Sequence, residues 1–298
     1  LYGDKNIYAF INGFLKRNRT AVPFQALLWN DYEDDGKDRN MPLDFIFRGT
    51  EVCSMRSGWG QNDTFVALHA GKNALVHGHS DVGEFVLDMQ GERFAMALGK
   101  DNYELVTPIW HGLYRERAEG HNTIVLNPGA YPDQSKTSDA LIDRFESHRG
   151  EAFAVTDMTT AYKDNARFAI RGVKLTDNRR VVIVRDEIEC FEGSDIWWFM
   201  HTDANISLSD DGKTAVLEKN NKKIKMSVLG SNDLKFQIKD AAPFPSTPLP
   251  TNGTQNPNTG IKKLAIHIIG AEKADITVAA SPENYTLKES YLENINKW

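Results

Sequence analysis

The sequence has little cysteine: Cys53 and Cys190 are the only two thiols among 298 residues. Such a widely separated pair permits one long-range disulfide or two buried thiols, and it excludes a ribbon or cluster of closely spaced cysteines. No run of eighteen apolar residues occurs, so a membrane-spanning helix is not expected. The first residues, LYGDKNIYAF, lack the features of a signal peptide and do not begin with Met, which indicates an internal start.

Positive charge is not in excess either. The formal net charge is −6, so no broad basic field is available to attract nucleic acid. The sequence also lacks a G-x-S-x-G elbow, a P-loop, a Rossmann glycine pattern and an H-E-x-x-H helix, which argues against a nucleotide or redox cofactor. Hydrophobic residues make up 41% of the chain and charged residues 26%, a balance that is typical of a folded protein.

The first 42 residues have a helical pattern. Apolar side chains recur there at three- and four-residue spacing, which predicts one amphipathic helix containing Ile7, Phe10, Ile11, Phe14 and Leu15. A second short helix is expected from Pro23 to Trp29, and the charged stretch 31–40 has the composition of a linker. We therefore expect a short helical N-terminal extension over residues 1–42.

From residue 43 onward the chain consists of short apolar segments bounded by Gly, Asn, Asp or Pro, without a long helical period between them. This pattern predicts an all-β domain over residues 43–298, a large antiparallel β-sandwich of supersandwich type. The expected strands are Phe45–Phe47, Val52–Met55, Phe65–Leu68, Glu84–Asp88, Phe94–Leu98, Asn122–Leu126, Ala152–Asp157, Phe168–Leu175, Arg180–Arg185, Asp195–His201, Thr214–Lys219, Lys223–Val228, Leu234–Ile238, Lys263–Gly270 and Asp275–Ala280. A proline-rich loop is expected over 241–260 and a short helix over 283–298.

The stretch His77-Gly78-His79-Ser80-Asp81 is the clearest candidate for a site. If it is extended, the two-residue period of a strand places His77, His79 and Asp81 on one face. Three ionisable groups within the reach of one strand indicate chemistry or metal binding. The alternative is a hydrogen-bonded strand histidine beside a glycine turn, with Asp81 fixing the tautomer of a neighbouring imidazole.

Together with several later motifs, this stretch resembles the heparinase II/III-like polysaccharide lyases. The motifs that carry the resemblance are His77–Asp81 with Gly83 and Phe85, Ala97-Leu98-Gly99, the stretch 114–123 (YRERAEGHNT), the stretch 181–186 (VVIVRD) and the stretch 197–202 (WWFMHT). The resemblance extends over roughly residues 43–298, the C-terminal sandwich of that family.

The resemblance implies an antiparallel sandwich joined to an N-terminal α/α toroid, with the active cleft between the two. Residues 1–42 would then be a helical remnant and linker of the toroid. It further implies cleavage of a uronate-containing acidic polysaccharide by β-elimination, in a periplasmic or secreted enzyme. Because the toroid half of the cleft is missing, we expect very low lyase activity from this chain alone.

By the same resemblance, His77 matches the catalytic histidine of the sandwich, and Tyr114 is a candidate for a tyrosine at the cleft. Arg115 and Arg117 are candidates for binding the uronate carboxylate, since a guanidinium pairs with a carboxylate through two hydrogen bonds. The alternatives are that Tyr114 is a core or rim aromatic and that the two arginines only solvate an exposed face.

His79 and His121 match the two zinc-binding imidazoles of the family, whose zinc is structural. The third ligand of the family is an aspartate at the position of Ala97, and a methyl group cannot bind metal. A zinc site in this chain would therefore be empty, or completed by water or by another carboxylate such as Asp101. The alternative is that the two imidazoles hydrogen-bond each other or a backbone carbonyl.

Two other functions stay open from the sequence. One is a non-catalytic, glycan-binding or structural sandwich that keeps its histidines for stability. The other is a sugar hydrolase, which needs a carboxylate pair about 5–10 Å apart. Asp81 and Glu84 are the nearest candidates for such a pair.

Overall fold

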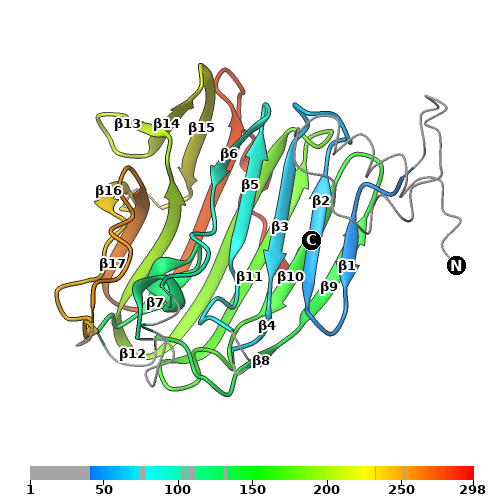
Figure 1. Cartoon of the computed structure of the whole chain (residues 1–298). Coiled ribbons are helices and arrows are strands. Elements are labelled where there is room, and N and C mark those ends of the chain that lie inside the picture. Colours follow the sequence, from blue (N-terminus) through cyan, green and yellow to red (C-terminus); the bar gives the residue numbers. More distant parts are fainter. Residues whose placement is uncertain are drawn as a thin grey trace, which may run out of the picture. The chain divides into compact units, whose positions relative to one another are not determined.

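The computed structural model describes residues 41–73, 75, 78–102, 105, 112–129, 133–231, 233–250 and 253–298 (Figure 1). The chain divides into two compact units, residues 1–42 and residues 43–298. The predicted N-terminal helices and the linker of residues 31–40 lie outside the described residues. The second unit contains all of the strands that the structure describes.

This unit is built from two large antiparallel sheets. The five-stranded sheet has the order β1-β2-β3-β5-β6. Its strands are β1 (Phe45–Phe47), β2 (Val52–Arg56), β3 (Phe65–His69), β5 (Phe85–Met89) and β6 (Glu92–Ala95). A separate two-stranded ladder pairs β4 (Gly71–Lys72) with β8 (Asp139–Ala140).

The ten-stranded sheet has the order β13-β14-β15-β17-β12-β11-β10-β9, and β16 and β7 pair with β17 and β12 beside this path. Its strands are β7 (Ile124–Leu126), β9 (Ile142–Ser147), β10 (Ala152–Asp157), β11 (Ala166–Thr176), β12 (Val181–Thr202), β13 (Asn205–Leu208), β14 (Thr214–Lys219), β15 (Lys222–Leu229), β16 (Phe236–Asp240) and β17 (Lys262–Pro282). Figure 1 shows the smaller sheet lying across the face of the larger one. The predicted all-β sandwich is confirmed.

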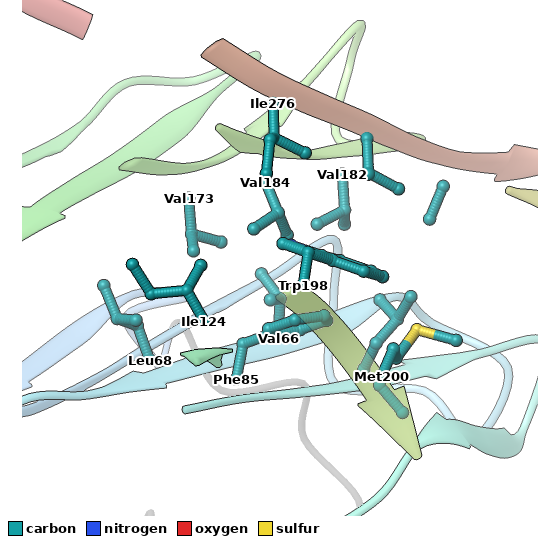
Figure 2. Close-up of a cluster of buried hydrophobic side chains, with 14 of the residues drawn as sticks. Val66, Leu68, Phe85, Ile124, Val173, Val182, Val184, Trp198, Met200 and Ile276 are labelled. Atoms are coloured by element: carbon teal, nitrogen blue, oxygen red, sulfur yellow. The ribbon is translucent and has the colours of Figure 1, made fainter. Parts of the chain in front are cut away.

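One apolar core lies between the two sheets, and the strands supply it by alternation. In β3 and β5 every second side chain is buried, because successive side chains of a strand point to opposite faces. Figure 2 shows the layer formed where Val66 and Phe85 of the smaller sheet meet Trp198 and Val184 of the larger sheet. The rings of Phe85 and Trp198 lie 6.0 Å apart, centroid to centroid.

In two places, the structure has one long strand where the sequence predicts two shorter ones. Residues 181–185 and 195–201 belong to β12, and residues 263–270 and 275–280 belong to β17. The apolar pattern breaks in between because both strands become exposed there, with register shifts from Glu189 to Ile196. The backbone ladder continues past this irregularity, which hydrophobic patterning does not reveal.

The helix predicted over residues 283–298 is wrong. The segment forms only two short 3₁₀ turns, η4 (Glu289–Leu292) and η5 (Ile295–Lys297). Its apolar side chains pack instead on the outer face of the large sheet, where Tyr291 contacts the cluster around Val181 and Ile183. The Tyr291 hydroxyl also donates to Asp177, so tertiary contacts hold the tail in a non-helical path.

Two further 3₁₀ turns, η2 (Tyr114–Glu116) and η3 (Ala118–Gly120), lead into β7. The described part of the chain contains no helix that is long and apolar enough to cross a membrane.

The core predicts a large stability effect at Trp198. Trp198→Ala should lower the free energy of unfolding by about 3–5 kcal/mol, because it removes a fully buried indole and leaves a cavity. Urea denaturation followed by circular dichroism measures this loss. Ile269→Ala, at a side chain that is 79% exposed, is the control and should change the value by less than about 0.5 kcal/mol. Equal effects of the two substitutions would contradict the assignment of the core.

Candidate functional site

Two segments far apart in the chain bring histidines together. The His79 segment (residues 78–84) connects β4 to β5, and the His121 segment (residues 121–123) connects η3 to β7. Nδ1 of His79 lies 3.2 Å from Nε2 of His121. The backbone N–H of Ser80 donates to the carbonyl oxygen of Glu116, 2.8 Å away, which joins the first segment to the turn just before the second.

Asp81 completes a group of three possible metal ligands. One donor atom from each of His79, Asp81 and His121 lies within 4.8 Å of the others. Two nitrogens bound at 2.0–2.1 Å to a tetrahedral zinc ion stand about 3.3 Å apart. The 3.2 Å between the facing imidazole nitrogens fits that requirement. The donor set of two nitrogens and one carboxylate oxygen is therefore compatible with zinc, and the same 3.2 Å is a hydrogen-bond distance between the two rings, which is the alternative stated from the sequence.

A carboxylate also lies beside His121, on the side of the ring that faces away from His79. Nδ1 of His121, on the ring edge away from His79, lies 3.0 Å from Oε1 of Glu84. Burial lowers the pKa of His121, but the nearby Glu84, together with Asp81, outweighs it and raises the pKa to about 9. A carboxylate behind a metal-binding imidazole fixes its tautomer and orientation. Glu84 is placed for that role.

His69 at the end of β3 is the partner of Asp81. Its Nδ1 lies 3.3 Å from Oδ2 of Asp81. Burial raises the pKa of Asp81, but the interaction with His69 and the charges of the other imidazoles lower it overall. The alternative in which Asp81 orients a neighbouring imidazole therefore has a candidate imidazole, that of His69.

The condition that residues 77–81 are part of a strand is not met over residues 78–81, the part of this stretch that the structure describes. Residues 78–84 lie between β4 and β5 and belong to neither strand. A Cβ atom on Gly78 would lie 2.9 Å from the carbonyl oxygens of Asn73 and Leu75, so only glycine fits there. Gly83 has a φ of +85°, a left-handed conformation that favours glycine. His77 itself lies outside the described residues, so its placement stays a prediction.

Tyr114 lies in a buried polar network. Its side chain is 1% exposed, and its hydroxyl oxygen is 2.7 Å from Nε2 of His201. Nδ1 of His201 faces Oδ1 of Asn122, 3.2 Å away, beside His121. Burial raises the pKa of Tyr114 well above its usual value, and burial with the charge of Lys263 lowers that of His201. Both groups are therefore held in their neutral forms at neutral pH.

The two candidate arginines have different surroundings. Arg117 is 1% exposed, and its guanidinium pairs with Asp133, with Nε 3.1 Å from Oδ2. Arg115 is partly exposed, and its Nε donates to Oδ1 of Asn258 at 2.8 Å. Its second donor, Nη1, lies 3.0 Å from the carbonyl oxygen of Lys100.

Next to Arg115 the surface is hollowed, with a cavity volume of about 630 Å³. The hollow is lined by Lys100, Asp101, Asn102, Thr254, Gln255, Asn256 and Pro257. Both carboxylate oxygens of Asp101 accept the backbone N–H of Asn256 at 3.0 Å. Asp101 therefore braces this loop, and it is not among the three possible ligands that lie close together. The third possible donor is Asp81, while Ala97 is exposed.

Lys263 lies beneath this network in an aromatic cage. Its ammonium nitrogen is 5.0, 4.5 and 5.0 Å from the ring centroids of Tyr114, Phe199 and Phe244, and it donates to the Ala242 carbonyl. Burial lowers the pKa of Lys263 to about 8.

Sequence reasoning missed His69, Glu84 as a partner of His121, His201 and Lys263. His69, His201 and Lys263 have no local spacing pattern that indicates a role. His69 ends a strand whose alternation only indicates burial, and His201 and Lys263 pair across two strands that are distant in sequence. The one usable signal was the short separation of Glu84 from the histidine motif.

Comparison with known proteins identifies relatives. The model of the family described as heparinase II/III-like, C-terminal, matches residues 52–282. No curated protein matches the sequence significantly. Among solved structures, heparan sulfate lyase HepC from Pedobacter heparinus is similar, with a TM-score of 0.65 and 14% identity over 96% of this chain and 43% of that one.

A crystal structure of heparinase III gives a TM-score of 0.60 and 16% identity over 81% of this chain and 37% of that one. Chondroitin AC lyase from Streptomyces coelicolor gives a TM-score of 0.54 and 12% identity, over 94% of this chain and 39% of that one. The chain thus spans less than half the length of these structures. At such identities the likeness shows a shared fold.

The lowered pKa of Lys263 predicts a pH dependence of stability. The unfolded chain, with a lysine pKa of 10.5, binds this proton more tightly than the folded chain, with a pKa of about 8. The contribution of Lys263 to stability therefore increases as the pH rises from about 8 to 10.5, and it is smallest below about pH 8, where the folded and unfolded chains both carry the proton. From pH 7.5 to 9.5 the gain should be about 2 kcal/mol.

Denaturation of the wild type and of Lys263→Met at both pH values measures this effect. The difference in unfolding free energy between the two proteins should shift by that amount in favour of the wild type. A constant difference would show that Lys263 keeps an ordinary pKa.

Proposed function

Because this chain belongs to the family of heparinase II/III-like C-terminal domains, we propose that it forms the sandwich wall of a lyase cleft that cleaves uronate-containing acidic polysaccharide by β-elimination. The observation that carries the proposal is the meeting of the His79 and His121 segments, two of the motifs that resemble the family, at one group of donor atoms.

The reaction makes definite demands on the cleft. A base removes the proton on the carbon that bears the uronate carboxylate, the bond to the oxygen at C4 breaks, a C4–C5 double bond forms, and the leaving oxygen takes a proton. Negative charge develops on the carboxylate, so cations or hydrogen-bond donors must meet it there. An imidazole suits the proton transfers because its pKa lies near neutrality.

His77 is the acid/base residue in this proposal. It stands two residues before His79, so anchoring His79 restricts the region that the imidazole of His77 can reach. Precise proton transfer requires a well-positioned side chain, and the anchored His79 segment would contribute to that positioning.

Arg115 is the better placed of the two arginines to bind the uronate charge. It is partly exposed, and it stands beside the hollow of residues 100–102 and 254–257. A substrate role for Arg117 requires its guanidinium to leave Asp133, and a catalytic role for Tyr114 requires its hydroxyl to leave His201. In the described arrangement, Arg117 and Tyr114 support the turns that lead to His121.

We further propose that His79, His121 and Asp81 hold a zinc ion, with water as the fourth ligand. Bound zinc would act as a structural tie between the two histidine segments. Glu84 would orient His121 from behind.

The proposed other half of the cleft is an N-terminal α/α toroid on a longer chain, and the proposed location is the periplasm or the outside of the cell. Neither nucleic acid nor a membrane is needed as a partner. The competing function is a non-catalytic, glycan-binding or structural sandwich, which an assay of lyase activity separates from the lyase.

Zinc content tests the metal proposal. The purified chain should contain one zinc ion by elemental analysis after dialysis, and His121→Ala should lose it. His267→Ala is the matched control, because His267 pairs with Asp195 away from the site and should leave the zinc content unchanged. Equal zinc contents in the two variants would rule the site out.

Lyase activity tests the function. Formation of the unsaturated uronate is followed by absorbance, with this chain and with a longer chain that carries the N-terminal domain. The longer chain should turn over, and His77→Ala should lower its kcat about 10²- to 10⁴-fold. His148→Ala, at an exposed histidine paired with Glu146, should leave kcat unchanged.

The 298-residue chain should show very little turnover. Robust activity of the short chain would contradict the need for a second cleft wall. Glycan retention without product in either chain would favour the non-catalytic alternative.

A further inference from the structure

A buried ion pair lies inside the sandwich, on the large sheet. Arg171 of β11 and Asp186 of β12 are directly opposite each other in the strand register. Nε and Nη2 of the guanidinium donate to the two carboxylate oxygens at 2.7 and 2.8 Å. Both side chains are completely shielded from solvent.

The remaining nitrogen of Arg171 reaches across to both histidine segments. Nη1 donates to the carbonyl oxygen of Gly83, 2.6 Å away, and to that of Asn122, 2.7 Å away. Gly83 belongs to the His79 segment, and Asn122 directly follows His121. One guanidinium therefore ties together the two segments that supply the metal-binding group.

An ion pair in this place is not explained by stability alone. Removing both charges from water costs several kcal/mol per ion, and apolar residues of similar volume often serve a core equally well. The neighbours of Arg171 on the same face of β11, Ala169 and Val173, belong to the apolar core. The pair does, however, meet a specific need, because two loop carbonyls turn inward here and require donors.

The planar, forked guanidinium also fixes the directions of its hydrogen bonds relative to one another. Asp186 fixes two of its nitrogens, so the direction of the third is set by β11 and β12 and not by the loops. The loop carbonyls must come to that nitrogen, which limits how far apart the two segments can move. A lysine at this position has no planar fork and cannot hold all four oxygen atoms in the same way.

We infer that Arg171, oriented by Asp186, is a positioning residue that sets the contact between His79 and His121. It touches neither imidazole and acts through the backbone of both segments. This inference concerns the arrangement of the chain with or without metal, so it can fail or hold independently of the lyase proposal.

Arg179 provides a matched control. It is also buried and pairs with Asp44 through two bonds of 2.8 and 2.7 Å. Like Arg171 it donates to backbone carbonyls, those of Arg56 and His148. None of these partners belongs to either histidine segment.

The experiment compares Arg171→Lys with Arg179→Lys in the 298-residue chain. Both substitutions should lower the midpoint of urea unfolding. Only Arg171→Lys should weaken zinc binding, by about 10- to 100-fold, the usual cost of losing a residue that orients metal ligands. Competition with a chromogenic chelator, well below the unfolding midpoint, measures the affinity.

A second readout does not depend on metal. With histidine-selective labelling, the metal-free wild type should show a nuclear Overhauser effect between the rings of His79 and His121, whose centroids are 5.2 Å apart. This effect should persist in Arg179→Lys and disappear in Arg171→Lys. If Arg171→Lys does not fold, Asp186→Asn is the second variant. It keeps the guanidinium but removes the carboxylate that orients it, and it should weaken the nuclear Overhauser effect between the two rings.

The inference is overturned if the ring-to-ring effect is the same in the Arg171 and Asp186 variants as in Arg179→Lys. If Arg171→Lys lowers stability but leaves the zinc affinity unchanged, Arg171 has only a structural role and the inference likewise fails. If the wild type binds no zinc, the metal proposal fails and the ring contact alone decides the role of Arg171.

Discussion

The candidate site depends on one constraint: two loops can enter the interior of a sandwich only if their backbone polar groups find partners there. The carbonyl oxygen of Val82 accepts the Thr123 hydroxyl at 2.8 Å and the amide of Gln134 at 2.9 Å. The side-chain amide of Asn122 donates to the carbonyl of Phe85 at 2.8 Å. Unpaired, each such group would cost roughly 1–3 kcal/mol, so these bonds determine where the loops lie.

This constraint also explains why the polar residues of the site occur in layers. The imidazoles of His79 and His121 face each other, and Glu84 stands behind one of them. Tyr114, His201 and Lys263 form a second buried group, in which the Tyr114 hydroxyl meets His201 and the Lys263 ammonium lies over the Tyr114 ring. His201 belongs to β12 and Lys263 to β17, and strands are a better support for precise geometry than loops.

The sequence allows the architecture to be predicted because alternation reports burial directly. The strands around Val66, Phe85 and Val184 follow that rule, and the motifs at residues 77–81 and 114–123 carried the resemblance to the family. The structure of residues 1–40 and of His77 stays a prediction, since these residues lie outside the described part of the chain.

What the sequence did not reveal depends on contacts between distant positions. Asp81, and not a residue at the position of Ala97, lies close enough to His79 and His121 to be a third donor, because the two segments meet in the fold. Likewise, β12 and β17 pair through an exposed, irregular stretch where the apolar pattern is lost. The partners of Arg171 are identified only when the two sheets face each other. Local patterning has no access to such pairings.

X-ray absorption spectroscopy at the zinc edge of the purified chain tests the central claim most directly. If the two histidine segments meet at one ion, the spectrum should show two imidazoles and oxygen ligands at about 2.0–2.2 Å, without sulfur. A sulfur ligand at about 2.3 Å, or a single imidazole, would contradict the account, because the two segments would then not converge on one ion.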